Sequence, residues 1–291
     1  MEKDLDQSKE EKSYKRGALK KLSESENRII NIQKSKILEN KFGQEKIKQF
    51  SMVNLTHLFY YFYTCESVND MGWGCVCRSM QSLLKYQLSL TNQNKDNAIS
   101  FYNLFIKYGN KDTLIEIYKK MNKNKDISKT LDILKNTSFS PYENEDGWAE
   151  PFISQLVLYD FGFEGELILI DHYCERNCAP KEVFERIIDF EQFKEKLKNH
   201  FSQNNPAPVI MDDASISICI IGFKFNEENK NIELFIMDPH SSFKPEIGLY
   251  IIVLNDKGKI VEIMPNEMVL ASPRIYFDNN NAWMAYFLKS Y

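Results

Sequence analysis

The sequence lacks long apolar runs and has no strong excess of either charge. No stretch of its 291 residues approaches the ~20 apolar residues that a helix needs to cross a bilayer. Residues 1–21 are charged and contain no apolar core of a secretory signal. The 37 basic and 41 acidic residues give a formal net charge of −4, so no basic field exists to attract nucleic acid. We therefore expect a cytoplasmic protein with no transmembrane segment and no nucleic-acid partner.

Cysteine is sparse, with six residues in the chain, and a chain of this length is not a small disulfide-rich domain. We expect free thiols in a reducing compartment. Cys174 and Cys178 are four residues apart with His172 nearby, a spacing that resembles half of a zinc site. Because no second half is evident, a surface loop is the favoured interpretation. We predict neither a metal nor an organic cofactor.

Residues 1–48 contain few apolar side chains and many Lys, Glu, Gln, Ser and Asn residues. This composition predicts a charged arm that is disordered or loosely helical, either without a role or acting as a docking segment. The composition changes at Phe50, and residues 49–291 are predicted to form the folded domain. The chain is 43% hydrophobic, which is enough to bury a sizeable core.

The first half of the folded domain has helical patterns. Between residues 75 and 90 apolar side chains recur near every 3.6 residues, and neither Gly nor Pro interrupts them, which predicts a buried helix. A second helix is predicted over residues 148–161. A strand is predicted over residues 167–170, and an exposed amphipathic helix over residues 184–201.

The second half is rich in apolar runs of strand type. Runs at 216–225 and 232–238 flank a charged turn, and runs at 249–254 and 260–263 flank Asn-Asp-Lys-Gly. Each pair has the signature of a β-hairpin. Helices followed by an antiparallel-rich sheet indicate an α+β fold.

Cys75 has two features of a reactive thiol. It follows Gly72-Trp73-Gly74, where glycine allows a tight turn and leaves space beside the sulfur. It also opens the predicted helix, whose positive dipole end favours a thiolate. Taken alone, a cysteine at a helix start is more often a small buried hydrophobic residue.

Asp238-Pro239-His240 follows the predicted strand 232–238 directly. Alternating strand geometry predicts that positions 238 and 240 lie on the same side, so that the carboxylate can orient the imidazole. An ordinary strand-end turn is the alternative, since Asp-Pro commonly starts turns.

Together these motifs resemble those of the proteases for ubiquitin-fold modifiers. Residues 72–81 read Gly-Trp-Gly-Cys-Val-Cys-Arg-Ser-Met-Gln and resemble the run around the nucleophile in two branches, the Ufm-specific proteases and the autophagins. Both branches also carry Asp-Pro-His downstream. Residues 60–65 read Tyr-Tyr-Phe-Tyr-Thr-Cys and look like the Tyr-Tyr-His-Tyr-x-Cys run of the short Ufm-specific proteases. The resemblance spans residues 55–291 in patches.

The resemblance implies a papain-like cysteine protease fold with the nucleophile at a helix N-terminus. It implies a triad of Cys75, Asp238 and His240, with Tyr63, twelve residues before the nucleophile, donating a hydrogen bond to the oxyanion. Trp73, with Gly74 beside it, is expected to cover the channel for the modifier's thin tail. The implied activity is cleavage after the C-terminal glycine of a ubiquitin-like modifier, whose precursors and conjugates are the expected partners.

One departure from the family bears on the substrate. The family usually has three glycines where this chain has Asp212, Asp213 and Ala214. We expect Asp212 and Asp213 to lie at the surface that the modifier tail approaches. Two alternatives stay open: an autophagin-like or deubiquitinating protease on the same scaffold, and a catalytically weak pseudo-protease that binds a modifier.

Overall fold

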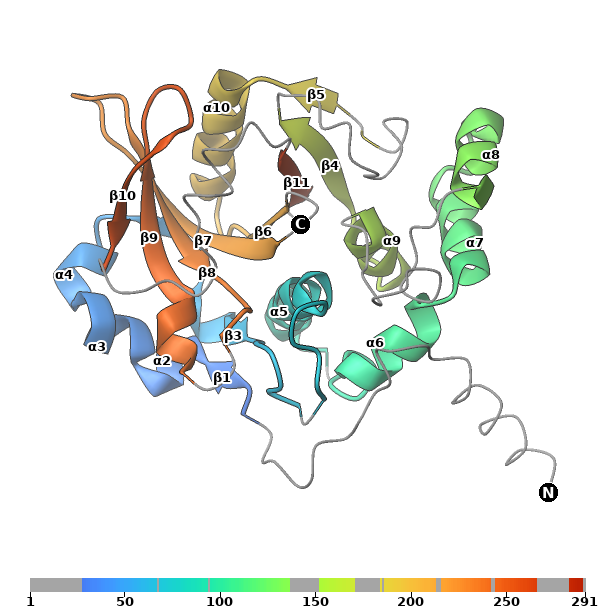
Figure 1. Cartoon of the computed structure of the whole chain (residues 1–291), viewed down its shortest axis with the longest axis horizontal. Helices are drawn as coiled ribbons and strands as arrows, with labels where there is room; N and C mark the ends of the chain where they lie inside the picture. The colour runs from blue at the N-terminus through green and yellow to red at the C-terminus, as the bar shows by residue number, and fades with distance from the viewer. Residues whose placement is uncertain are drawn as a thin grey trace.

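The computed structural model describes residues 28–66, 68–93, 95–136, 152–170, 184, 186–212, 216–241, 244–265 and 283–289. The helices lie mainly in the first part of the chain (Figure 1). They are α2 (Ile32–Ser35), α3 (Ile37–Phe42), α4 (Gln44–Ile47), α5 (Cys75–Leu90), α6 (Phe101–Tyr108), α7 (Lys111–Met121), α8 (Ser128–Asn136), α9 (Phe152–Asp160) and α10 (Phe190–Phe201), with short 3-10 turns η1 (Leu55–His57) and η3 (Pro245–Gly248). Within the described residues, no helix combines the length and the apolar character that crossing a membrane requires.

The strands form one large sheet and one small pair. They are β1 (Ile30–Asn31), β2 (Ser51–Met52), β3 (Phe59–Tyr60), β4 (Gly165–Ile170), β5 (Arg186–Ile188), β6 (Val209–Asp212), β7 (Ser217–Phe225), β8 (Ile232–Met237), β9 (Leu249–Leu254), β10 (Ile260–Met264) and β11 (Trp283–Leu288). The large sheet has the order β10-β9-β8-β7-β6-β11-β4-β5, with β2 beside β7, and β1 pairs with β3. Only β4 and β5 pair in parallel among the described strands. The predicted α+β fold is confirmed.

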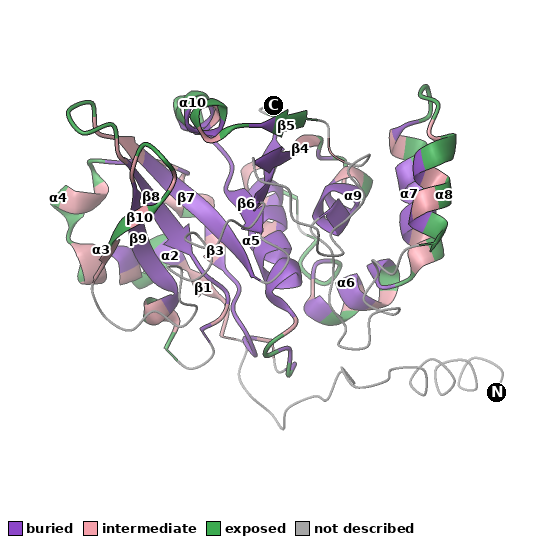
Figure 2. Ribbon diagram, turned by 45° about the horizontal axis from the view of Figure 1, so that its top comes forward, coloured by how far each residue is buried: buried purple, intermediate pink, exposed green. Residues whose placement is uncertain are grey.

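Helix α5 is the centre of the molecule. It packs on β6 and β7 on one side and on α6 and α9 on the other, and in Figure 2 it is coloured as buried along most of its length. Its buried residues include Val76, Met80, Leu83 and Leu84, the apolar positions that predict the helix. A helix that is buried almost all round belongs to a core rather than to a surface. Its first residue, Cys75, is therefore held by packing on several sides.

Both predicted hairpins are present. Strands β7 and β8 pair through Phe225 and Ile232, and the Asn226 N–H donates to Asn231 O across the turn at 2.9 Å. Strands β9 and β10 are joined by a turn at 255–259. Every residue of β8 and β9 is buried. Strands buried on both faces read as continuous apolar runs, which is why the sequence indicates them clearly.

The helix predicted over residues 184–201 is wrong in its first part. Residues 186–188 form the edge strand β5, which pairs with β4, and the helix begins only at Phe190. The Asp189 side chain accepts from the Gln192 N–H at 2.8 Å, and the Gln192 side chain accepts from the Asp189 N–H, a capping box that sets the helix start. The helix predicted over 148–161 corresponds to α9, and residues 148–151 lie outside the described residues.

The described part of the predicted arm, residues 28–48, is mostly helical. Ile32 and Leu38 are buried in the main hydrophobic core, and β1 pairs with β3 directly ahead of the loop that leads to Cys75. Residues 1–27 lie outside the described residues. The division of the chain at residue 48 stays a prediction.

Candidate active site

Cys75 lies buried at the N-terminus of α5. Gly74 precedes it as the N-cap residue, and the Gly74 N–H donates to the Asp70 carbonyl at 2.9 Å. A Cβ atom on Gly74 would lie 2.5 Å from Asp70 Oδ2, so the close approach of these two residues requires glycine. Gly72 has a φ of +84°, in the left-handed region. Steric constraints therefore favour glycine at both positions of the motif.

Asp238 and His240 lie on the turn that ends β8. His240 Nδ1 donates to Asp238 Oδ1 at 2.5 Å, and the His240 backbone N–H donates to the same oxygen at 2.9 Å. The carboxylate therefore fixes both the backbone and the ring of His240. Strand alternation was the expected cause of their shared side, but the chain turns at Pro239 and a local side-chain turn brings the two groups together.

The side chain and the backbone of Asp238 are themselves held by partners within the core. Tyr250 in β9 donates from its hydroxyl to Asp238 Oδ2 at 3.0 Å. The Tyr60 hydroxyl donates to the Asp238 carbonyl, and the Asp238 N–H donates to Gly248 O at 2.7 Å. Burial and the neighbouring carboxylate raise the pKa of Tyr250 well above its usual value, so this phenol stays a donor.

The charged form of His240 is strongly favoured over the neutral form. Burial acts to lower its pKa, but the charge of Asp238 and the hydrogen bond to it act in the opposite direction, as do a side-chain hydrogen bond and charge interaction with Cys75. The balance raises the pKa of His240 to about 10. With Nδ1 engaged by Asp238, Nε2 is the ring nitrogen left for the thiol. The imidazole thus interacts with both Asp238 and Cys75.

Tyr63 approaches the same histidine from the loop after β3. Its ring centroid lies 5.1 Å from that of His240, at an interplanar angle of 72°, and its N–H donates to Pro239 O at 2.9 Å. The Tyr63 hydroxyl is buried and has no hydrogen-bond partner of ordinary geometry in the described part of the chain. Burial and the nearby Cys75 sulfur, a weak acceptor, raise its pKa, so the hydroxyl stays protonated.

The remaining predicted site residues differ in where they lie. Trp73 packs edge-on against Phe101 and Phe105 of α6, with ring centroids 5.5 and 5.6 Å away. Asp212 is the last residue of β6 and is only 2% exposed. Asp213 lies outside the described residues. The role predicted for the two aspartates stays a prediction.

The other described cysteines are buried and have raised pKa values. Burial is the main cause that raises the pKa of Cys65 to about 11 and that of Cys77 and Cys219 to about 12. Cys77 follows Cys75 by two residues in α5, where it is buried. Cys174, Cys178 and His172 lie outside the described residues, and no group of three metal-ligating side chains occurs among the residues that are described.

Residues 163–258 match the model of peptidase family C78. The matched residues make up about a third of the chain. The match includes Asp238 and His240, and Cys75 lies ahead of it. This match agrees with the family resemblance that the sequence motifs indicate.

The chain is also similar in structure to a protein whose crystal structure is known, UfSP from C. elegans. The two share 15% sequence identity, with a TM-score of 0.47. The similarity covers 83% of this chain and 34% of that one, so the chain spans about a third of the length of UfSP. No curated protein matches the sequence.

Some residues of this candidate site carry no sequence signal. Tyr250 lies within the continuous apolar run of β9, and nothing in that run indicates that its hydroxyl donates to Asp238. Tyr60 lies in an aromatic run. Arg78 does give a signal, because an arginine three residues into a buried helix needs a buried anionic partner.

Proposed function

We propose that this chain is a thiol peptidase that cleaves after the C-terminal glycine of a ubiquitin-like modifier, in precursor maturation, deconjugation or both. The observation that carries the proposal is the position of His240, which interacts with the Asp238 carboxylate and with the Cys75 thiol at the start of a buried helix. The match of residues 163–258 to a peptidase family supports the reaction class.

In the proposed reaction, the Cys75 thiolate attacks the carbonyl carbon of the terminal glycine. The imidazolium of His240 gives its proton to the leaving amine as the C–N bond breaks, and a thioester to Cys75 forms. Water then attacks the thioester and gives a proton to His240. The C–S bond breaks, releasing the modifier carboxyl group and restoring the thiolate. Asp238 orients the ring and stabilises its charge in both steps.

The proposed oxyanion site consists of the Tyr63 hydroxyl and the Cys75 backbone N–H. The first N–H groups of a helix have no intrahelical acceptor, so that of Cys75 is available to a substrate oxygen. A buried hydroxyl without a partner is unusual and calls for a reason. An oxyanion that forms beside Cys75 during the reaction supplies the missing acceptor.

We propose that substrate selection depends on the approach to Cys75. Trp73 and Gly74 immediately precede the nucleophile, and a thin tail that ends in glycine fits an approach bordered by an indole ring. Asp212 is buried, so it is proposed to act on the tail through its charge rather than by direct contact, with Asp213 beside it in sequence. Their charge favours a tail with a basic residue near the terminal glycine.

The test uses propargylamide probes made from three modifiers: a ubiquitin-fold modifier, ubiquitin and an autophagy-type modifier. The proposal expects covalent labelling by the first probe, loss of labelling in Cys75→Ala and retention in Cys77→Ala. Cys77 is the matched control, because it is a buried cysteine two residues away in the same helix. Preferential labelling by either of the other probes would assign the chain to that specificity. Binding without labelling or turnover would make it a pseudo-protease.

A further inference from the structure

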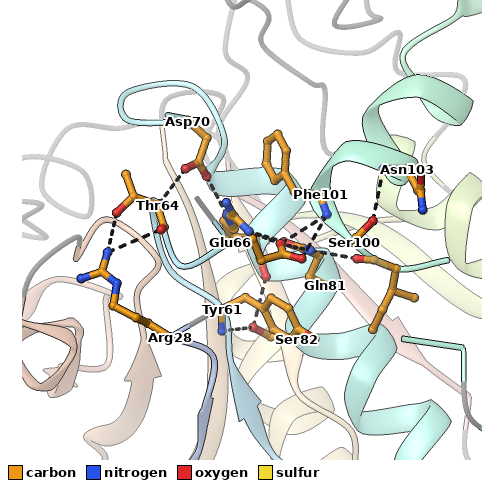
Figure 3. Close-up of polar contacts among 12 residues, drawn as sticks. Arg28, Tyr61, Thr64, Glu66, Asp70, Gln81, Ser82, Ser100, Phe101 and Asn103 are labelled. Carbon is orange, nitrogen blue, oxygen red and sulfur yellow. Dashed lines mark hydrogen bonds and ion pairs between the residues drawn. The ribbon is translucent and has the colours of Figure 1, made fainter. Parts of the chain in front are cut away.

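We infer that Asp70 is a positioning residue, which holds the Tyr63 hydroxyl at a fixed place relative to Cys75. Asp70 bonds at the same time to the turn that carries Tyr63 and to the helix that carries Cys75. The inference rests on the proposed function, in which Tyr63 stabilises the oxyanion. Figure 3 shows the Asp70 carboxylate beside Thr64, with dashed lines that run from it to Thr64 and in the direction away from Thr64.

The turn that carries Tyr63 has an unusual backbone conformation. Thr64, the next residue, has a φ of +64°, in the left-handed region that β-branched residues rarely adopt. Such a conformation persists only where the surroundings impose it, and it clusters at functional sites. Here it sets the direction in which the chain leaves Tyr63.

Two side chains hold Thr64 in this conformation. Its N–H donates to Asp70 Oδ1 at 2.8 Å. On the other side, Arg28 Nη2 donates to Thr64 Oγ1, also at 2.8 Å (Figure 3). Arg28 precedes β1, and its backbone N–H donates to Cys65 O at 2.9 Å. The Tyr63–Thr64 turn is therefore clamped from both sides.

The other oxygen of Asp70 is bound to α5. Arg78 Nε donates to Asp70 Oδ2 at 2.6 Å, and neither side chain is exposed. Arg78 also pairs with Glu66 and is fully buried, and its guanidinium carbon lies over the Phe101 ring, 4.3 Å from the centroid. Because Arg78 is three residues after Cys75 in α5, one carboxylate connects the Tyr63 turn to the nucleophile's helix.

Stability alone does not account for this arrangement. A buried ion pair is weak evidence for stability, since the loss of hydration offsets much of the attraction. Glu66 also binds Arg78, but its further contacts are to Gln81 and the Phe101 N–H, which lead away from Thr64. Asp70 is the carboxylate of the two that contacts Thr64. Both carboxylates bind Arg78, and Asp70 also binds Thr64. Comparing substitutions of Asp70 and Glu66 therefore distinguishes the positioning of Tyr63 from the anchoring of Arg78.

The experiment measures kcat and KM of Asp70→Asn in the full chain, in the wild-type and Tyr63→Phe backgrounds, with a fluorogenic modifier substrate. If Asp70→Asn displaces the Tyr63 hydroxyl, kcat should fall by about 10- to 100-fold with little change in KM. In the Tyr63→Phe background the same substitution should lower kcat by less than about twofold, because the donor is already absent. Glu66→Gln, the matched control, should keep kcat within about twofold of wild type.

Arg28→Met provides a milder test in case Asp70→Asn does not fold. It removes the bond to Thr64 Oγ1 and should lower kcat by about threefold or more in the wild-type background alone. Arg186→Met, which breaks a surface pair with Glu166, is its control. Equal losses in both backgrounds would overturn the inference and leave the proposed function intact. If Tyr63→Phe itself leaves kcat unchanged, the oxyanion role in the proposed function fails, and the inference fails with it.

Discussion

Replacing Asp238 by Asn removes the group that keeps His240 charged. The difference between an ordinary histidine pKa of 6.5 and the value of about 10 here corresponds to roughly 5 kcal/mol in favour of the imidazolium. Without the carboxylate, burial lowers the pKa of His240 and only the interaction with Cys75 still raises it, so the pKa falls toward its ordinary value of 6.5. At pH 8 the charged fraction then drops by about 30-fold, because pH 8 lies 1.5 units above a pKa of 6.5.

The assay is kcat/KM on a fluorogenic modifier substrate between pH 5 and 10.5. The wild type should hold its activity until the pH approaches 10, whereas Asp238→Asn should lose it on a limb near pH 6.5. Tyr250→Phe is the control, since it removes a hydrogen bond to Asp238 Oδ2 and keeps the carboxylate. An alkaline limb in Asp238→Asn within about one pH unit of the wild-type limb would refute the electrostatic role of Asp238.

The same group affects stability, with a sign that follows from its raised pKa. A histidine whose folded pKa exceeds its unfolded pKa stabilises the protein fully below the unfolded value, and this contribution is lost as the pH rises. For His240 the loss falls between pH 6.5 and about 10. The difference in free energy of unfolding between the wild type and His240→Gln should therefore shrink across this window in denaturant titrations.

Two further substitutions and one labelling experiment test the neighbouring groups. Tyr63→Phe should lower kcat by about 10- to 1000-fold with little change in KM, and an unchanged kcat would remove Tyr63 from the mechanism. Gly74→Ala should lower kcat by about 10- to 100-fold, because the new Cβ displaces Asp70 or the helix start; wild-type kcat in a folded variant would contradict this. At pH 8 iodoacetamide should modify Cys75 and spare Cys77, whose pKa is about 12. Mass spectrometry that locates the adduct on Cys77 instead would reverse the assignment.

The parts of the fold that the sequence predicts are those fixed by local chemistry. Both hairpins and α5 follow from apolar patterns whose turns and glycines are close in sequence. Strand β5 was missed, since the mixture of charged and apolar residues over 184–201 also suits a helix, and pairing with β4 decides the outcome. The contact of Tyr250 with Asp238 depends on the register of β8 and β9, which the motifs do not encode.

The candidate site likewise contains residues that local motifs indicate and residues whose role depends on contacts in the folded chain. Cys75, Asp238 and His240 are proposed from their motifs, and Tyr63 from the resemblance to the Ufm-specific proteases. The left-handed Thr64 cannot be found this way, because threonine is not a residue type that signals a positive φ. Its conformation results from side chains that converge on it in the folded state.

The place of β11 in the sheet has a consequence for how the chain acquires its structure. Among the described strands, β11 is the one that joins β4 to β6, pairing with both in antiparallel fashion. Until residues 283–288 have been synthesised and have paired, β4 and β6 each expose an unpaired strand edge. Most residues of these two strands are buried in the folded chain, so other chains can pair with the open edges. Pairing across more than 70 residues of sequence is slow, so it comes late in folding. A ribosome that stalls before residue 283 therefore leaves a nascent chain with both edges unprotected, and such chains are expected to need a chaperone.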